Sequence, residues 1–182
     1  MSVLKRLNLR FAVLMMIYGG VVFLVYRDEV LGSFLAPLAE STAFITCELM
    51  HHLGIDALRD GAVLTHSGGF AYEIAYTCTG VLPAVTFMAC VFAYPGTLRN
   101  KWIGVAIGVP ALLAVNYLRL INLFYIGVSF PGAFGLAHAV LWEGLLAISF
   151  IGLWMGWIGW SNNRQSAKTE RDTDRMIGSE QL

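Results

Sequence analysis

The sequence predicts an all-α integral membrane protein with about four transmembrane helices, an amphipathic helix on the outer membrane surface and a short hairpin. Of its 182 residues, 57% are hydrophobic and only 13% are charged, whereas about a quarter of the residues in a soluble domain are charged. Long apolar runs recur along the chain, with short polar segments between them. Lysine and arginine concentrate in those segments that four crossings would leave on one side of the membrane.

Four apolar segments approach or exceed the length of about 20 residues that a helix needs to cross a bilayer. They are Leu7–Tyr26, Cys78–Tyr94, Trp102–Phe130 and His138–Trp160. The first segment follows a basic N-terminus, as a signal peptide does, but no small-residue cleavage site closes it. We therefore expect a retained anchor helix. The second segment is short for a crossing, so its helix is expected to start a few residues earlier.

A fifth apolar segment, Val30–Ile55, contains a proline and several charged or histidine side chains. A straight crossing would bury these groups at a cost of a few kcal/mol for each charge, so we predict an amphipathic helix that lies on the membrane surface. The following segment, Asp56–Thr77, is polar. His66–Gly69 separates "AVLT" from "FAYEIAY", a spacing that predicts a short hairpin.

Residues 1–160 are expected to form a single membrane domain, because no internal repeat or soluble second domain is apparent. From Ser161 onward the chain lacks apolar periodicity, so residues 161–182 are expected to form a disordered cytoplasmic tail. Four crossings with both ends in the cytoplasm leave only Arg27 and Arg59 outside among the basic residues of the loops and termini. The basic residues then inside are Lys5, Arg6, Arg10, Arg99, Lys101, Arg164, Lys168, Arg171 and Arg175.

This topology brings three reactive side chains to one depth. Cys78 begins a span that runs inward and therefore lies at the outer face. Arg119 follows the inner start of the next span by about 17 residues, which raises it about 25 Å through a core of about 30 Å. His138 begins the last span, again at the outer face.

Each of these residues also has a simpler interpretation. A buried cysteine is usually a small hydrophobic residue, and we interpret Cys47 and Cys90 in this way. A guanidinium within an apolar helix normally faces a partner or a wet cavity, although Arg119 could instead extend to the lipid headgroups. Asn116 and Asn122 lie three residues to either side of Arg119, so the three side chains share one helical face.

Candidate substrate-binding residues are Asn116, Glu73 and Glu143. The two glutamates could orient Arg119 or His138, or they could simply face water. A lone histidine is more often an interfacial hydrogen-bonding residue, and this is our interpretation of His51, His52 and His66. The histidines lack ligand spacing and the three cysteines form no CxxC pair. We therefore expect neither a metal nor a cofactor.

Cysteine, histidine and arginine together have a coherent chemical use. A thiolate is a strong nucleophile, and nearby positive charge or a helix N-terminus favours it. His138 would take the thiol proton and return it to a leaving amine, while Arg119 would hold the oxyanion. The product would be a thioester acyl-enzyme, which water resolves in a protease and an amine or hydroxyl resolves in a transpeptidase.

The residues "CTG" at Cys78–Gly80 and "NYLR" at Asn116–Arg119, with His138 in a later apolar segment, resemble the exosortase/archaeosortase family of multi-span cysteine transpeptidases. The resemblance extends from about Gly61 to Ile148 and is closest to the short form called exosortase H. It implies that Cys78 is the nucleophile, Arg119 the essential arginine and His138 the third catalytic residue.

The resemblance also implies a multi-pass enzyme of the inner membrane of a Gram-negative-type bacterium, with its active site facing the periplasm. Family substrates are exported proteins with a C-terminal motif, a transmembrane helix and a basic cluster. The enzyme cleaves near the motif and passes the new carboxyl terminus to an acceptor, which the sequence does not identify. Membrane lipids are the other expected partners, and nucleic acid is not expected. The alternative is a non-enzymatic membrane subunit or lipid-binding assembly factor with an inert Cys78.

Overall fold

The computed structural model of the protein describes residues 13, 16, 19–20 and 29–180. The expected anchor helix, Leu7–Tyr26, lies largely outside the described residues. The described part is mostly helical, and its longer helices are α2 (Glu29–His52), α3 (Val81–Ala93), α4 (Leu98–Ser129) and α6 (Trp142–Glu180). Short helical segments join them: η1 (Tyr76–Cys78), η2 (Pro131–Ala133), α5 (Phe134–Leu136) and the π-helix η3 (Ala137–Leu141).

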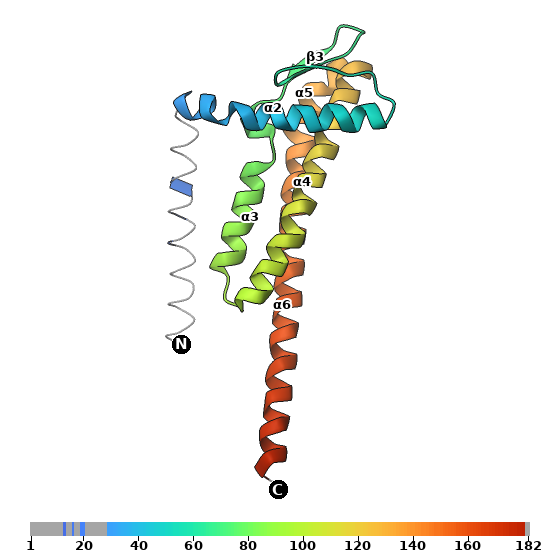
Figure 1. The fold of residues 1–182 in the computed structure, drawn as a ribbon. Helices are drawn as coiled ribbons and strands as arrows, with labels where there is room; N and C mark the ends of the chain where they lie inside the picture. Colours follow the sequence, from blue (N-terminus) through green and yellow to red (C-terminus); the bar gives the residue numbers. More distant parts are fainter. Residues whose placement is uncertain (1–12, 14–15, 17–18, 21–28, 181–182) are drawn as a thin grey trace.

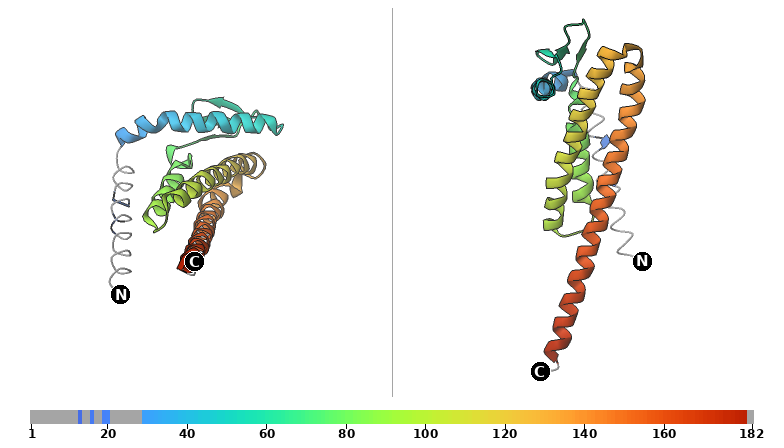
Figure 2. Two further views of the ribbon diagram at one scale, coloured as in Figure 1. Left: turned by 60° about the horizontal axis from the view of Figure 1, so that its bottom comes forward. Right: turned by 90° about the vertical axis from the view of Figure 1, so that its right-hand side faces the viewer.

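Three helices, α3, α4 and α6, lie side by side, and α2 lies crosswise at one end of them (Figure 1). The second view of Figure 2 shows α2 end-on while the other helices are seen along their length, and α6 extends well beyond the far ends of α3 and α4. The short helix η1, which ends at Cys78, packs against α2, so Cys78 lies at the end of the molecule where α2 crosses.

Among the described residues, two helical segments are long and apolar enough to cross a membrane, Leu98–Ser129 and Pro131–Ala167. They correspond to two of the predicted spans. The helix expected at Cys78–Tyr94 is shorter, since α3 begins only after Gly80 and ends before Pro95. Large apolar side chains on α4 and α6 are exposed, including Leu118 and Ile148, as contact with lipid requires.

The amphipathic helix α2 buries one face against the rest of the protein. The buried side chains recur at helical spacing and include Ala39, Ala43, Cys47 and Met50. At its end, Cys47 Sγ and His51 Nε2 both donate hydrogen bonds to the Ala57 carbonyl, at 3.5 and 2.7 Å. His51 thus has the hydrogen-bonding role expected from the sequence.

A small antiparallel sheet follows α2, with strands β1 (Leu58–Asp60), β2 (Val63–Thr65) and β3 (Ala71–Glu73) in that order. Strands β2 and β3 pair with Val63 opposite Glu73, on either side of the segment where the sequence predicted a turn. Strand β1 was not anticipated, because three residues are too few to show an alternating pattern. Leu64 and Ile74 are fully buried and pack with Met50 and Phe124, so the sheet is part of the core.

One aromatic side chain of the sheet region fixes it to the helices. Phe70 lies so close to α4 that a Cβ atom added to Gly127 would be 2.0 Å from its ring. The same ring makes edge contacts with Phe124 and Phe134, at centroid distances of 5.9 and 5.6 Å. The glycine at position 127 is therefore required by close packing rather than by backbone conformation.

We expect Gly127→Ala to destabilise the protein by about 1–3 kcal/mol, because the new methyl group must displace the Phe70 ring. Thermal unfolding of the purified full-length protein in detergent measures this effect. Gly159→Ala is the matched control, since a Cβ atom at that helical glycine meets nothing within 4 Å. Equal melting temperatures for the two variants would contradict the packing role of Gly127.

The C-terminal segment differs from the prediction, because α6 continues as a helix to Glu180 instead of becoming disordered after Ser161. The preceding span supplies a formed helix, so the tail only needs to extend it and avoids the cost of nucleation. Many of its residues are good helix formers, such as Gln, Ala, Lys, Glu and Arg. Ser161 is itself buried and accepts a hydrogen bond from Asn100 Nδ2 at 3.2 Å.

Candidate active site

Cys78 lies in a tight connection between the sheet and α3. It is the last residue of η1, and α3 begins three residues later. The intervening Gly80 has φ +78°, a conformation that side chains other than hydrogen rarely adopt. Thr79 Oγ1 donates to the Tyr76 carbonyl at 2.8 Å and closes the turn. The "CTG" motif thus forms a sharp bend that holds the cysteine ahead of the helix.

Asn116 of α4 holds this bend from the other side. Its Nδ2 donates to the Cys78 carbonyl at 2.9 Å. Gly80 allows the close approach, because an added Cβ atom would lie 2.9 Å from Asn116 Cγ. Asn116 was predicted to bind substrate; what the structure shows is a side chain that lines the cavity and positions the backbone of Cys78.

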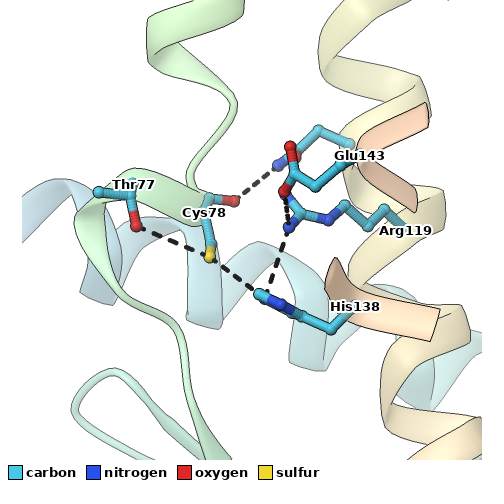
Figure 3. Close-up of polar contacts among 6 residues, drawn as sticks. Thr77, Cys78, Arg119, His138 and Glu143 are labelled. Carbon is cyan, nitrogen blue, oxygen red and sulfur yellow. Dashed lines mark hydrogen bonds and ion pairs between the residues drawn. The ribbon is translucent and has the colours of Figure 1, made fainter. Parts of the chain in front are cut away.

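Arg119 and His138 meet Cys78 in the same place, although the three residues come from different elements (Figure 3). His138 Nε2 lies 3.9 Å from Cys78 Sγ and 3.5 Å from an Arg119 Nη atom. The same Nη atom donates to Glu143 Oε1 at 2.8 Å. Arg119 is only 3% exposed, so it points into the protein rather than toward lipid headgroups.

His138 lies on the π-helix η3, a feature that the sequence did not predict. The wide turn of a π-helix interrupts regular helical geometry, and such turns are frequent at functional sites. The His138 ring stacks on Phe134, with centroids 6.0 Å apart and planes at 26°. Phe134 in turn contacts Phe70 and Tyr72, so a cluster of aromatic rings supports the imidazole.

Tyr72 is a half-buried member of this aromatic cluster. Its hydroxyl donates to the Leu120 carbonyl at 3.1 Å. Burial raises the pKa of Tyr72 well above its ordinary value, with the nearby Cys78 as a smaller cause. The phenol therefore remains a neutral hydrogen-bond donor and joins β3 to α4 beside the site. Sequence reasoning missed Tyr72 and Phe134, for which the only signal was the aromatic content of the polar segments.

A cavity of about 520 Å³ opens beside these residues. Its polar end contains Thr77, Cys78, Asn116, Arg119, His138 and Glu143. Its other end is lined mainly by apolar side chains of α3 and α6: Leu82, Pro83, Thr86, Leu146, Ala147, Phe150 and Ile151. The volume is within the range of about 300–1,000 Å³ that is usual for ligand sites.

Two predicted residues lie elsewhere. Glu73 is exposed on β3 and is not among the residues that line this cavity. Asn122, which shares a helical face with Arg119, does not line the cavity either, and it accepts a hydrogen bond from Trp142 Nε1 at 3.0 Å. The three polar side chains on this face of α4 therefore have different roles. Asn116 and Arg119 line the cavity, and Asn122 joins α4 to α6.

Within the described residues, none of the three cysteines forms a disulfide bond. Cys47 and Cys90 are buried and Cys78 is half-buried. Burial also raises the pKa of the Cys47 thiol, which makes it a weaker nucleophile. The described part of the chain contains no group of three or more histidine, cysteine or acidic side chains that could hold a metal ion.

A family model described as transmembrane exosortase matches residues 4–168. Searches of curated proteins and of solved structures gave no match. The matched range contains both candidate membrane spans in full and every residue of the cavity. The match confirms the family resemblance seen in the short motifs. The apolar, lipid-suited helices and this match together show a membrane protein that belongs to the transmembrane exosortase family.

Proposed function

We propose that the protein is a membrane cysteine transpeptidase that cleaves C-terminal sorting signals of exported proteins through a thioester acyl-enzyme. The proposal depends on one observation: a thiol, an imidazole and a guanidinium line the same cavity. The imidazole Nε2 of His138 lies 3.9 Å from Cys78 Sγ and 3.5 Å from an Nη atom of Arg119. Membership of the exosortase family points to the same class of reaction. The three groups are those that acyl transfer through sulfur requires.

In the first step, Cys78 Sγ attacks the carbonyl carbon of the scissile peptide bond while His138 Nε2 takes the thiol proton. A carbon–sulfur bond forms, and the electron pair of the carbonyl π bond moves to oxygen. Arg119 stabilises the resulting oxyanion, since its guanidinium is a buried positive charge at the wall of the cavity. Glu143 pairs with the guanidinium and holds it in place.

In the second step, the tetrahedral intermediate collapses and the carbon–nitrogen bond breaks. His138 returns its proton to the leaving amine, and a thioester remains on Cys78. An incoming amine, hydroxyl or water then attacks the thioester with His138 as the base, and the thiol is restored. The fragment that bears the substrate's transmembrane helix leaves in the first half of the reaction.

The proposed location is the inner membrane, with several crossings and the cavity on the periplasmic side. The excess of lysine and arginine in the opposite loops and in the tail supports this orientation. The position of α2 across the same end as Cys78 suits a helix on the outer surface. A substrate held by its own transmembrane helix then has a high effective concentration near the thiol.

The decisive experiment adds hydroxylamine to membranes that contain the full-length protein and its native exported substrates. A thioester transfers its acyl group to this amine, so processed proteins should acquire a C-terminal hydroxamate, which intact-mass measurement detects. A Cys78→Ala strain is the control and should show neither cleavage nor hydroxamate. Cleaved substrates that carry only free carboxyl termini would indicate a hydrolase, and uncleaved substrates in both strains would favour the non-enzymatic subunit.

Gly80→Ala should reduce processing by about 10²-fold, because misplacement of a reactive group by about 1 Å has an effect of this size. The methyl group would strain a backbone at φ +78° and press on Asn116, which holds the Cys78 carbonyl. Rates of substrate processing in membranes with equal amounts of protein measure the loss. Gly144→Ala serves as the control, because its Cβ atom would meet nothing within 4 Å. Unchanged processing by Gly80→Ala would show that the bend tolerates a side chain.

A further inference from the structure

The cavity beside Cys78 has a second, apolar half that the reaction at the thiol does not use. Leu82 and Pro83 of α3 form one wall, and Leu146, Phe150 and Ile151 of α6 form the other. This half is continuous with the polar end, since one cavity contains both sets of residues. Whatever reacts with Cys78 therefore has an adjoining apolar channel between two membrane helices.

The channel opens toward the surroundings of the helices rather than ending inside the protein. Ile151 lines it and is 51% exposed, and Ala147 one turn earlier is also exposed. Because α6 belongs to a segment long and apolar enough to span the membrane, this opening faces the lipid region. An apolar segment within the bilayer can thus reach the channel sideways.

Two buried polar atoms of residues at the polar end of the cavity lack partners among the described residues. Asn116 Oδ1 and Arg119 Nε have no hydrogen-bond partner, although their residues are only 1% and 3% exposed. Rotation of the Asn116 amide cannot relieve this, because Nδ2 is already bonded to the Cys78 carbonyl. Buried polar groups are nearly always satisfied, so the two atoms indicate a ligand that supplies one donor and one acceptor.

A peptide backbone supplies both groups. In an extended chain, the N–H and C=O of one residue point to the same side, as they do when paired strands exchange both hydrogen bonds. Asn116 and Arg119 are three residues apart on α4 and so lie on one face of it. Asn116 Oδ1 and Arg119 Nε therefore present an acceptor and a donor about one helical turn apart. A lipid acyl chain has no polar groups and would leave both atoms without a hydrogen bond.

We infer that the channel between α3 and α6 binds the start of the substrate's transmembrane segment, while Asn116 Oδ1 and Arg119 Nε bind the extended backbone that precedes it. This inference rests on the proposed function and specifies where its substrate lies. The apolar side chains after the scissile bond contact Leu82, Phe150 and Ile151. The substrate enters sideways from the bilayer, and its helix fragment leaves by the same opening.

The first test replaces Ile151 by a benzophenone amino acid in the full-length Cys78→Ala protein, so that uncut substrate accumulates. Irradiation of whole cells should join position 151 to exported precursors, and digestion should locate the link in an apolar C-terminal segment that precedes a basic cluster. The same amino acid at Leu118, which is 59% exposed on α4 and does not line the cavity, is the control. Links to lipid only, or equal capture of precursors at both positions, would overturn the inference.

The second test narrows the channel without changing the polar end. Ala147→Leu should slow substrate processing about tenfold, because a few added methylene groups in an apolar pocket discriminate to this extent. The rate at which iodoacetamide alkylates Cys78 should stay unchanged, since this small reagent does not need the channel. Ala114→Leu, at an exposed position of α4 outside the cavity, should change neither rate.

The two readouts separate failure of this inference from failure of the proposed function. Normal processing by Ala147→Leu, or an equal fall in processing and alkylation, would overturn the channel as the binding site for the substrate helix. Normal processing by the Cys78→Ala strain would instead overturn the proposed chemistry.

Discussion

Cys78→Ala is expected to abolish processing of exported proteins, with a loss of at least about 10⁴-fold, because no other group in the site can form the thioester. Of the cavity residues, Cys78 alone carries a thiol, and its sulfur is 3.9 Å from His138 Nε2. The measurement is the intact mass of proteins that end in an apolar helix and a basic cluster, compared between strains. The precursors should accumulate at full length in the variant strain.

Three further variants make the Cys78 result specific. Cys78→Ser should also be severely impaired, because a serine hydroxyl is a far weaker nucleophile than a thiolate at neutral pH. Cys47→Ala and Cys90→Ala are matched controls, since both thiols are buried and lie outside the cavity, and they should process normally. Processing of precursors by Cys78→Ala at the wild-type rate would contradict the covalent mechanism.

Arg119→Lys is expected to lower the rate of processing about 10²- to 10³-fold, the usual effect of removing an oxyanion donor. The planar guanidinium reaches Glu143 and His138 from one nitrogen and leaves Nε for a further bond. A lysine ammonium is a mobile point charge that cannot reproduce this fork. Single-turnover cleavage of a native precursor in detergent solution, at equal enzyme concentrations, measures the change.

Glu143→Gln provides the comparison for Arg119→Lys. Its side chain is 58% exposed, whereas that of Arg119 is 4% exposed, so water screens the ion pair from the glutamate side. The loss should therefore remain below about tenfold. The glutamine oxygen can still accept the hydrogen bond from Arg119.

Near-normal turnover of Arg119→Lys would contradict the role of Arg119 as the oxyanion donor. It would show that position 119 needs only positive charge, and the guanidinium would then have a structural role.

Hydrophobic patterning and the lengths of the apolar runs were sufficient to predict the two membrane-spanning segments that the described residues contain. Leu98–Ser129 and the segment from Pro131 correspond to predicted spans, because a run of apolar residues has few alternatives in lipid. A helix on the membrane surface was predicted from the proline and charged residues of Val30–Ile55, and the structure shows a helix there, α2, that lies crosswise to the others. Strand β1 was missed since its pairing depends on contacts with β2 rather than on its own three residues.

Part of the candidate site could be predicted because polar and charged side chains are energetically unfavourable within apolar segments. Arg119 was predicted as a site residue because a guanidinium is costly within a membrane span. In the structure it lies next to His138 and Glu143. Glu73 had no such constraint, and its side chain lies on the surface. The π-helix under His138 could not be predicted, since it depends on how α6 packs and not on a local residue preference.

The crosswise helix α2 has a consequence for how a cleavage position would be chosen. Under the proposed orientation, it rests on the lipid surface at the same end as Cys78 and so fixes the height of the sulfur above the bilayer. The distance between the outer end of the substrate's transmembrane helix and the bond that is cut would then be constant. Residues inserted between motif and anchor would shift the cut toward the anchor by the same number of residues.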